Sequence, residues 1–229
     1  MVMNRREWCK GMAALPAMLM LTKTGFAAAD DKAVWGAAAK GKILMPIGDA
    51  TEVIDTFYPY FRLQEEGYEP VVAGPEARLY HLVTHEIPPD SSIPWDITRE
   101  GPGYHLKADI AFRDVKPAEY AGLFLSGGRA PEYLRYDKDL IKAVRHFFDA
   151  GKPVASVCHG VELVAAAGVL KGRKMTTVPK CEMDITQNGG EYLNKSWVID
   201  GNLVSCQTWH DYGTPFFKTF LGWLDNRKG

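Results

Sequence analysis

A short apolar run in the sequence leads directly into a cysteine, a histidine and a glycine. Residues 153–157 predict a buried strand, Cys158 and His159 follow, and Gly160 allows a sharp turn into a helix. This order is typical of a nucleophile elbow, in which the reactive side chain points out of the turn. The N-terminus of the following helix favours a thiolate, and its N–H groups can bind an oxyanion. We therefore predict that Cys158 is a nucleophile; the alternative is a buried structural cysteine.

Strands and helices alternate along the chain, which is the pattern of an α/β protein with a largely parallel sheet. Apolar runs predict strands at residues 42–47, 70–73, 122–125, 153–157 and 174–178. Apolar residues at helical spacing predict one helix from Glu52 to Gly67 and others at about 138–148 and 216–224. A β-hairpin is predicted with its turn at 200–201 and its arms at 197–199 and 203–206.

The composition favours one folded globular domain. Of 229 residues, 46% are hydrophobic and 24% are charged, a profile that excludes an intrinsically disordered chain. The formal net charge is -1, so the sequence gives no electrostatic reason to expect nucleic acid as a partner. The sequence contains no dinucleotide-binding or phosphate-binding glycine motif and no Cys-x-x-Cys pair, so we expect no cofactor.

The first 29 residues have the features of an export signal. Arg5 and Arg6 precede an apolar run, and three consecutive alanines ending at Ala29 form a small-residue cleavage site. The arginine pair resembles a twin-arginine signal; an ordinary secretory signal is the alternative. The apolar run is too short to span a bilayer. We therefore predict a periplasmic protein without membrane contact after cleavage, with a signal peptide at 1–29, a linker at 30–41 and a domain at 42–227.

Four blocks of the sequence resemble the PfpI branch of the ThiJ/PfpI superfamily. They are residues 155–160 (ASVCHG), 125–132 (LSGGRAPE), 58–67 (YPYFRLQEEG) and 167–174 (AGVLKGRK). The resemblance implies a flavodoxin-like α/β sandwich, with a mostly parallel central sheet and helices on both faces. It also implies a relationship to class I glutamine amidotransferase domains and assembly as a homo-oligomer, a dimer or larger.

The resemblance also implies roles for four side chains. Cys158 matches the nucleophile and His159 its partner in the motif, while Glu52 matches a carboxylate that hydrogen-bonds the cysteine sulfur. Glu132 matches an acid that orients the histidine across a subunit interface. Apart from the family, Glu52 has the alternative role of an acid in the first turn of a helix, and Glu132 that of a surface helix cap.

Two consecutive glycines are candidates for an oxyanion site. Gly127 and Gly128 follow the strand predicted at 122–125, so they lie at the sheet edge that also carries Cys158. Their backbone N–H groups, together with that of His159, can hold a developing negative charge.

Residues 75–107 are rich in proline, and the stretch at about 80–100 is longer than the corresponding PfpI segment, so we predict an extended loop at about 75–107 that shapes the pocket or an oligomer contact. His81 and His85 are four residues apart and therefore share a face. With a neighbouring glutamate they can resemble a metal site, but histidines in such a loop more often line a pocket or face solvent, and we predict no metal. Trp209 and His210 are further pocket candidates; the alternative is packing against the C-terminal segment.

Three cysteines remain after signal cleavage: Cys158, Cys181 and Cys206. In an oxidising compartment, Cys181 and Cys206 can form a disulfide that leaves Cys158 free. A disulfide requires Cα atoms roughly 4.4–6.8 Å apart, and the sequence does not give this distance. Two free thiols are therefore the alternative.

The candidate residues together predict a cysteine-nucleophile enzyme. The Cys158 thiolate would attack an electrophilic carbonyl, with Glu52 and His159 moving protons and N–H groups holding the oxyanion. The resemblance implies a small-molecule or peptide substrate: small α-oxoaldehydes through glyoxalase-like chemistry, or amide and peptide bonds through hydrolysis. Two alternatives involve no turnover. One is a redox-sensing or protective protein that uses the Cys158 thiolate, and the other is a holdase-type chaperone.

Overall fold

The computed structural model describes residues 40–86 and 98–226 of the chain. The signal peptide predicted at 1–29 and nearly all of the linker predicted at 30–41 lie outside these residues, so both stay predictions. Within the described ranges, no helix has the length and apolar character needed to cross a bilayer.

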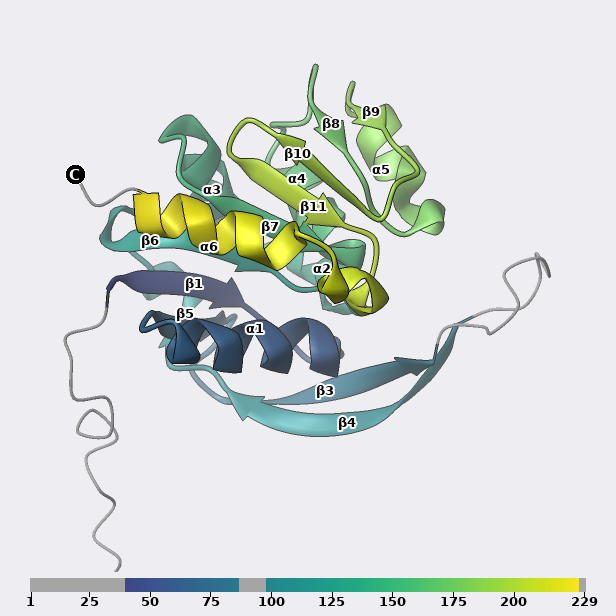
Figure 1. The fold of residues 1–229 in the computed structure, drawn as a ribbon. Helices are drawn as coiled ribbons and strands as arrows, with labels where there is room; N and C mark the ends of the chain where they lie inside the picture. The colour runs from purple at the N-terminus through teal and green to yellow at the C-terminus, as the bar shows by residue number, and fades with distance from the viewer. Residues whose placement is uncertain (1–39, 87–97, 227–229) are drawn as a thin grey trace, which may run out of the picture. The chain divides into compact units, whose positions relative to one another are not determined.

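A seven-stranded sheet forms the centre of the domain (Figure 1). Neighbouring strands pair in parallel except for the β10–β11 hairpin, which confirms both the mostly parallel sheet and the predicted hairpin. The carboxyl ends of β1, β6 and β7 therefore meet at one edge, where open α/β sheets bind ligands. In spatial order the strands are β10 (Trp197–Asp200), β11 (Leu203–Cys206), β7 (Val154–Val157), β6 (Tyr120–Leu125), β1 (Lys42–Pro46), β2 (Glu69–Gly74) and β5 (Ile110–Ala111).

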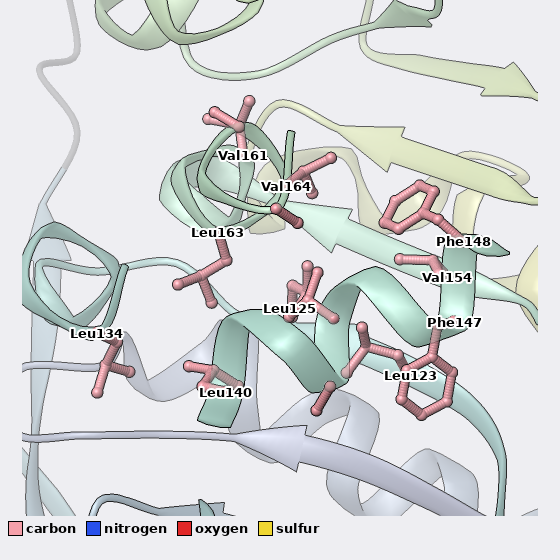
Figure 2. Packing of buried hydrophobic residues seen from close by; sticks show 14 of the residues in the cluster. Leu123, Leu125, Leu134, Leu140, Phe147, Phe148, Val154, Val161, Leu163 and Val164 are labelled. Atoms are coloured by element: carbon pink, nitrogen blue, oxygen red, sulfur yellow. The ribbon is translucent and has the colours of Figure 1, made fainter. Parts of the chain in front are cut away.

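One face of the sheet packs against α3 (Lys138–Asp149) and α4 (Val161–Ala166). Alternate residues of a strand point to opposite faces, so Leu123 and Leu125 of β6 lie on this side with Val154 of β7. Figure 2 shows these side chains against Phe147 of α3 and Val164 of α4. A cap fixes the start of α3, since the Asp137 side chain accepts the backbone N–H groups of Asp139 and Leu140.

The other face packs against α1 (Val53–Glu65) and α6 (Phe216–Asn226). Ile43 and Met45 of β1 and Phe124 of β6 alternate with the residues of the first face, and they contact Leu63 of α1 and Phe220 of α6. Helices therefore cover both faces, and the flavodoxin-like α/β sandwich expected from the sequence is confirmed (Figure 1).

The segment 75–107 contains a β-hairpin rather than the predicted loop. Strands β3 (Leu79–Glu86) and β4 (Arg99–Lys107) pair in antiparallel fashion as a separate two-stranded sheet. Tyr80 and Leu82 are buried and alternate with exposed residues, which is strand periodicity. The prolines suggested a loop, but Pro102 lies where the register of the hairpin shifts, a position at which a strand tolerates proline.

Short elements complete the domain. The strand predicted at 174–178 spans only Lys174–Met175 (β8). Beyond its end, the Thr177 hydroxyl donates to the carbonyl of Cys158. Strand β8 pairs with β9 (Glu191–Tyr192). The remaining helices are α2 (Ala130–Leu134), α5 (Glu182–Thr186) and the 3₁₀ turns η2 (Phe112–Asp114), η3 (Pro117–Glu119), η4 (Cys158–Gly160), η5 (Pro179–Cys181) and η6 (Trp209–Gly213).

Substitution of Phe220 by alanine should destabilise the domain, because its fully buried ring joins α6 to the sheet. We expect a loss of about 3–5 kcal/mol in the free energy of unfolding, measured by urea denaturation. Lys218→Ala on the exposed side of the same helix is the matched control and should change stability by less than about 0.5 kcal/mol. Similar losses in both variants would show that α6 contributes through its helical backbone rather than through this ring.

Candidate active site

Cys158 stands at a tight turn between β7 and α4. Its backbone φ is 53°, in the left-handed region that residues other than glycine rarely adopt. Gly160 makes this turn possible, because a Cβ atom there would lie 2.6 Å from the carbonyl oxygen of Leu125. The turn predicted between strand and helix is therefore present, and it holds the cysteine in a conformation that costs about 1–3 kcal/mol.

The Gly127–Gly128 segment after β6 lies against the cysteine. A Cβ atom on Gly127 would lie 2.9 Å from the Cys158 sulfur, so only glycine permits this approach. Gly128 has a φ of 84°, and a Cβ atom there would lie 2.4 Å from the backbone nitrogen of Glu52. Hydrogen bonds from the backbone N–H groups of Gly128 and His159 lower the pKa of the Cys158 thiol. The structure thus places two of the three predicted N–H donors at the sulfur.

Burial outweighs these hydrogen bonds and, together with the charge of Asp55, raises the pKa of Cys158 well above its usual value. This differs from the sequence expectation that the helix N-terminus favours a thiolate, because α4 is short and the sulfur is largely enclosed. Cys158 therefore carries its proton at neutral pH and needs a base to release it.

His159 is the candidate for that base. Its Nδ1 lies 3.2 Å from the Cys158 sulfur. Burial lowers the pKa of His159 to about 4, and the positive charge of Lys180 and the neighbouring His85 act in the same direction. The imidazole is therefore neutral at physiological pH and can accept the proton of the thiol.

Asp55 is the carboxyl group whose charge acts on the sulfur. Its Oδ2 and the Cys158 sulfur both approach the position of a Cβ atom on Gly127, at 2.7 and 2.9 Å. Tyr212 donates a hydrogen bond of 3.2 Å to the other oxygen, Oδ1. Burial and the neighbouring charge of Glu52 raise the pKa of Asp55 well above its usual value, which favours the protonated form of this carboxyl group. Sequence reasoning missed Asp55.

Glu52 has a different position from the one expected. It is the N-cap of α1, and its Oε2 accepts the backbone N–H of Asp55 at 2.6 Å. Hydrogen bonds from the N–H groups of Ile54 and His85 also lower its pKa, while burial raises it. The capping role, which was the alternative at the sequence level, accounts for these contacts. Asp55 rather than Glu52 is the acid beside the sulfur, and Glu52 acts on it through Asp55.

The position of Asp55 in the helix was a signal that could have identified it. Asp55, Pro59 and Leu63 are four residues apart and all buried, so they form the inner face of α1. An aspartate on the buried face of a helix is rare unless it is paired or functional.

The other predicted residues have contacts of their own elsewhere in the domain. Glu132 is exposed on α2, so its expected role across a subunit interface stays a prediction. The ring of His81 contacts that of His105 at 2.9 Å. His85 contacts Glu100 at 3.2 Å and also acts on the pKa of His159, so β3 contributes to the surroundings of the site.

Trp209 and His210 belong to η6, where their rings lie against each other with centroids 3.7 Å apart. The residue of this turn that reaches the site is Tyr212, through Asp55. Its ring also stacks on Tyr58 of α1, with centroids 4.9 Å apart. The C-terminal turn therefore contributes a tyrosine that the sequence did not single out.

The disulfide considered between Cys181 and Cys206 is not formed, and both are buried thiols. Cys181 packs in the cluster on the α3 and α4 side, while Cys206 packs in the cluster on the α1 and α6 side. The sheet separates the two side chains. Among the described residues, one group has the donor set of a metal site: His159, Glu162 and Cys181, with ligand atoms within 4.8 Å of one another.

The fold and the site together indicate a flavodoxin-like α/β protein that carries a cysteine nucleophile elbow at the carboxyl edge of its parallel sheet. The model of the DJ-1/PfpI family matches residues 41–220. The chain therefore belongs to the DJ-1/PfpI family, as the sequence resemblance implied.

Relatives and solved structures agree with this assignment. The chain is 38% identical over 164 residues to a protein named deglycase from Pyrococcus horikoshii, covering 72% of this chain and 88% of that protein. It is equally similar, over the same shares, to the deglycase PfpI of Pyrococcus furiosus. The crystal structure of a ThiJ/PfpI domain protein from Brachyspira murdochii has a TM-score of 0.67 and 17% identity, covering 83% of this chain and 99% of that one. At this identity the structure shows a shared fold.

The placement of the two acids predicts different effects on the thiol. Asp55→Asn should lower the apparent pKa of Cys158, because it removes the negative charge that opposes thiolate formation. The isosteric Glu52→Gln should change it little. The measurement is the pH dependence of alkylation at Cys158 by iodoacetamide, followed by mass spectrometry. A larger shift in Glu52→Gln than in Asp55→Asn would restore Glu52 as the acid that acts on the sulfur.

Proposed function

We propose that the protein is an enzyme that converts small α-oxoaldehydes into 2-hydroxy acids by covalent catalysis at Cys158. Family membership supports a cysteine-dependent enzyme, and the relatives named deglycases are consistent with carbonyl chemistry. The observation that carries the proposal is the geometry at the sulfur, where a neutral His159 lies 3.2 Å away and two backbone N–H groups converge.

In the first step the thiol adds to the aldehyde carbon. Nδ1 of His159 takes the thiol proton as the S–C bond forms, and the carbonyl oxygen becomes an oxyanion. We assign the role of holding this charge to the N–H groups of Gly128 and His159, which reach the sulfur. Return of the proton to the oxyanion gives a hemithioacetal.

In the second step a proton moves between neighbouring carbons. A base removes the proton from the carbon that bears the sulfur, and an enediol forms with the adjacent ketone. Reprotonation of the adjacent carbon gives a thioester of a 2-hydroxy acid, so one carbon is oxidised, its neighbour is reduced, and no external oxidant is needed. Water then cleaves the thioester and releases the acid and the free thiol.

The properties of His159 favour an aldehyde over an amide or peptide. Amide cleavage requires protonation of an amine leaving group, and a histidine with a pKa of about 4 is rarely protonated at neutral pH. Addition of a thiol to an aldehyde releases no leaving group. It needs only a base that takes the thiol proton and then returns this proton to the oxyanion. Hydrolysis of peptides would require an acid that raises this pKa. The family resemblance suggests Glu132 of another subunit as an acid that orients the histidine.

The raised pKa of Asp55, whose carboxyl group lies beside the sulfur, favours one second candidate. A protonated acid in this position can donate a hydrogen bond to an oxidised cysteine and stabilise a sulfinic acid, as a redox-sensing protein requires. Peroxide titration of Cys158, read by mass spectrometry in wild type and Asp55→Asn, tests this candidate.

The decisive experiment supplies methylglyoxal to the purified mature protein and follows loss of aldehyde and formation of lactate. We expect turnover in the wild type and a loss of at least about 1,000-fold in Cys158→Ser, since the covalent step is removed. Cys206→Ser, a buried thiol on the α1 side of the sheet, is the control. Absence of lactate from protein with an intact Cys158 thiol would exclude the glyoxalase-like reaction and leave the redox candidate.

The pKa of His159 sets the acid side of the activity profile. In metal-free buffer, kcat/KM should fall only near pH 4, because activity requires the neutral imidazole. Lys180→Met should move this limb to higher pH by less than about one unit, since loss of a positive charge favours the imidazolium. Lys218→Met on α6 should leave the profile unchanged. An acid limb near pH 6.5 in the wild type would contradict the role of a buried, neutral His159.

We also propose export to the periplasm, supported by the arginine pair and the alanine-rich cleavage site alone. Cell fractionation of the full chain beside the double variant Arg5→Lys/Arg6→Lys tests the twin-arginine route. Retention of the variant in the cytoplasm is the expected result, and periplasmic export of both forms would favour an ordinary secretory signal.

A further inference from the structure

We propose that His159, Glu162 and Cys181 form a site for a divalent cation of the zinc class, and that the bound metal switches off the nucleophile. The three residues come from different elements: His159 from η4, Glu162 from α4 and Cys181 from the end of η5. One ligand atom from each lies within 4.8 Å of the other two. None of the mechanistic steps above uses Glu162 or Cys181.

The donor atoms match the chemistry of zinc. An imidazole nitrogen, a carboxylate oxygen and a thiolate sulfur are the protein ligands that zinc takes, and three of them leave a fourth position open. Zinc–sulfur and zinc–nitrogen bonds of about 2.3 and 2.1 Å span at most about 4.4 Å between two ligand atoms. Small rotations of side chains therefore bring the observed separation to bonding distance.

The burial of the cluster has no purely apolar explanation. Glu162 is 5% exposed and Cys181 is 4% exposed, although a buried carboxylate is costly unless it is paired or binds a metal. Arg135 pairs with one oxygen of Glu162, Oε2, at 3.2 Å, and with Asp184 at 2.8 Å. The ion pair with Arg135 explains why Glu162 is tolerated, and it leaves the second carboxylate oxygen available to a cation. It does not explain why a thiol and an imidazole converge on the same point.

A metal at this position would act directly on the nucleophile. Cys158 already contacts Nδ1 of His159, so the metal would take Nε2. A histidine bound to a metal through Nε2 carries its remaining proton on Nδ1. Nδ1 then donates to the sulfur and is unable to accept the thiol proton. Metal binding and base catalysis by His159 are therefore mutually exclusive, a consequence that rests on the proposed function, whereas the site itself does not.

The binding test uses cobalt(II) as a spectroscopic substitute for zinc on the full mature chain. We expect one cobalt per chain, with a sulfur-to-cobalt charge-transfer band in the ultraviolet. Cys181→Ser should lose the band and bind zinc more than about 100-fold more weakly by competition. Glu162→Gln should keep the band and bind zinc more weakly than the wild type does. This second variant tests the site even if Cys181→Ser folds poorly. Cys206→Ser, the other buried thiol, should match the wild type.

The remaining variant locates the thiolate ligand. Cys158→Ser should retain the cobalt band, because the nucleophile is not a ligand. A band lost in Cys158→Ser and kept in Cys181→Ser would overturn the proposal by placing the metal on the nucleophile. The lack of any charge-transfer band in the wild type would overturn it as well.

Inhibition provides a separate readout for the consequence. Zinc should suppress methylglyoxal turnover with a midpoint equal to its dissociation constant, in the wild type and in Cys206→Ser. Relative to its own metal-free rate, Cys181→Ser should need more than about 100-fold more zinc. Equal sensitivity in all three proteins would overturn the switch. A protein that binds cobalt through Cys181 and shows no turnover would contradict the proposed function and leave the metal site standing.

Discussion

The left-handed turn at Cys158 is the constraint on which the rest of the site depends. It requires Gly160 on one side, since a side chain there would collide with the carbonyl of Leu125, and Gly127 on the other, where a side chain would collide with the sulfur. The loops after β1 and β6 and strand β3 are joined beside this turn, because Thr51 forms an isolated bridge with Gly128 and Glu52 forms another with Val83. The strain of one residue is thus balanced by hydrogen bonds from elements far apart in the chain.

Much of this arrangement could be predicted from the sequence because it is local. The strand, cysteine and glycine of the elbow are consecutive, and the apolar runs of the parallel strands are buried on both faces. The hairpin at 79–107 was missed because its prolines outweighed the alternation of Tyr80 and Leu82 with exposed residues. Proline content is evidence against a central strand, but not against one that forms a separate two-stranded sheet.

The acids and thiols could not be placed without the fold. Glu52 and Asp55 are three residues apart, and which of them faces the sulfur depends on the rotation of α1 against the sheet. Tyr212, which holds Asp55, is 157 positions away in the sequence. For Cys181 and Cys206 the decisive fact is that a sheet lies between them, which no count of cysteines reveals.

Among the described residues, Cys158 is partly buried and packs against both the hydrophobic cluster on the α3 and α4 side and the one on the α1 and α6 side. The Cys158 side chain therefore contacts the packed side chains on both faces of the sheet. A cavity formed in either layer would change the packing around the sulfur directly. The reactivity of this thiol therefore depends on the packing of both layers. A protein with this packing would therefore have to change both layers together, rather than one at a time, to adapt to a new temperature.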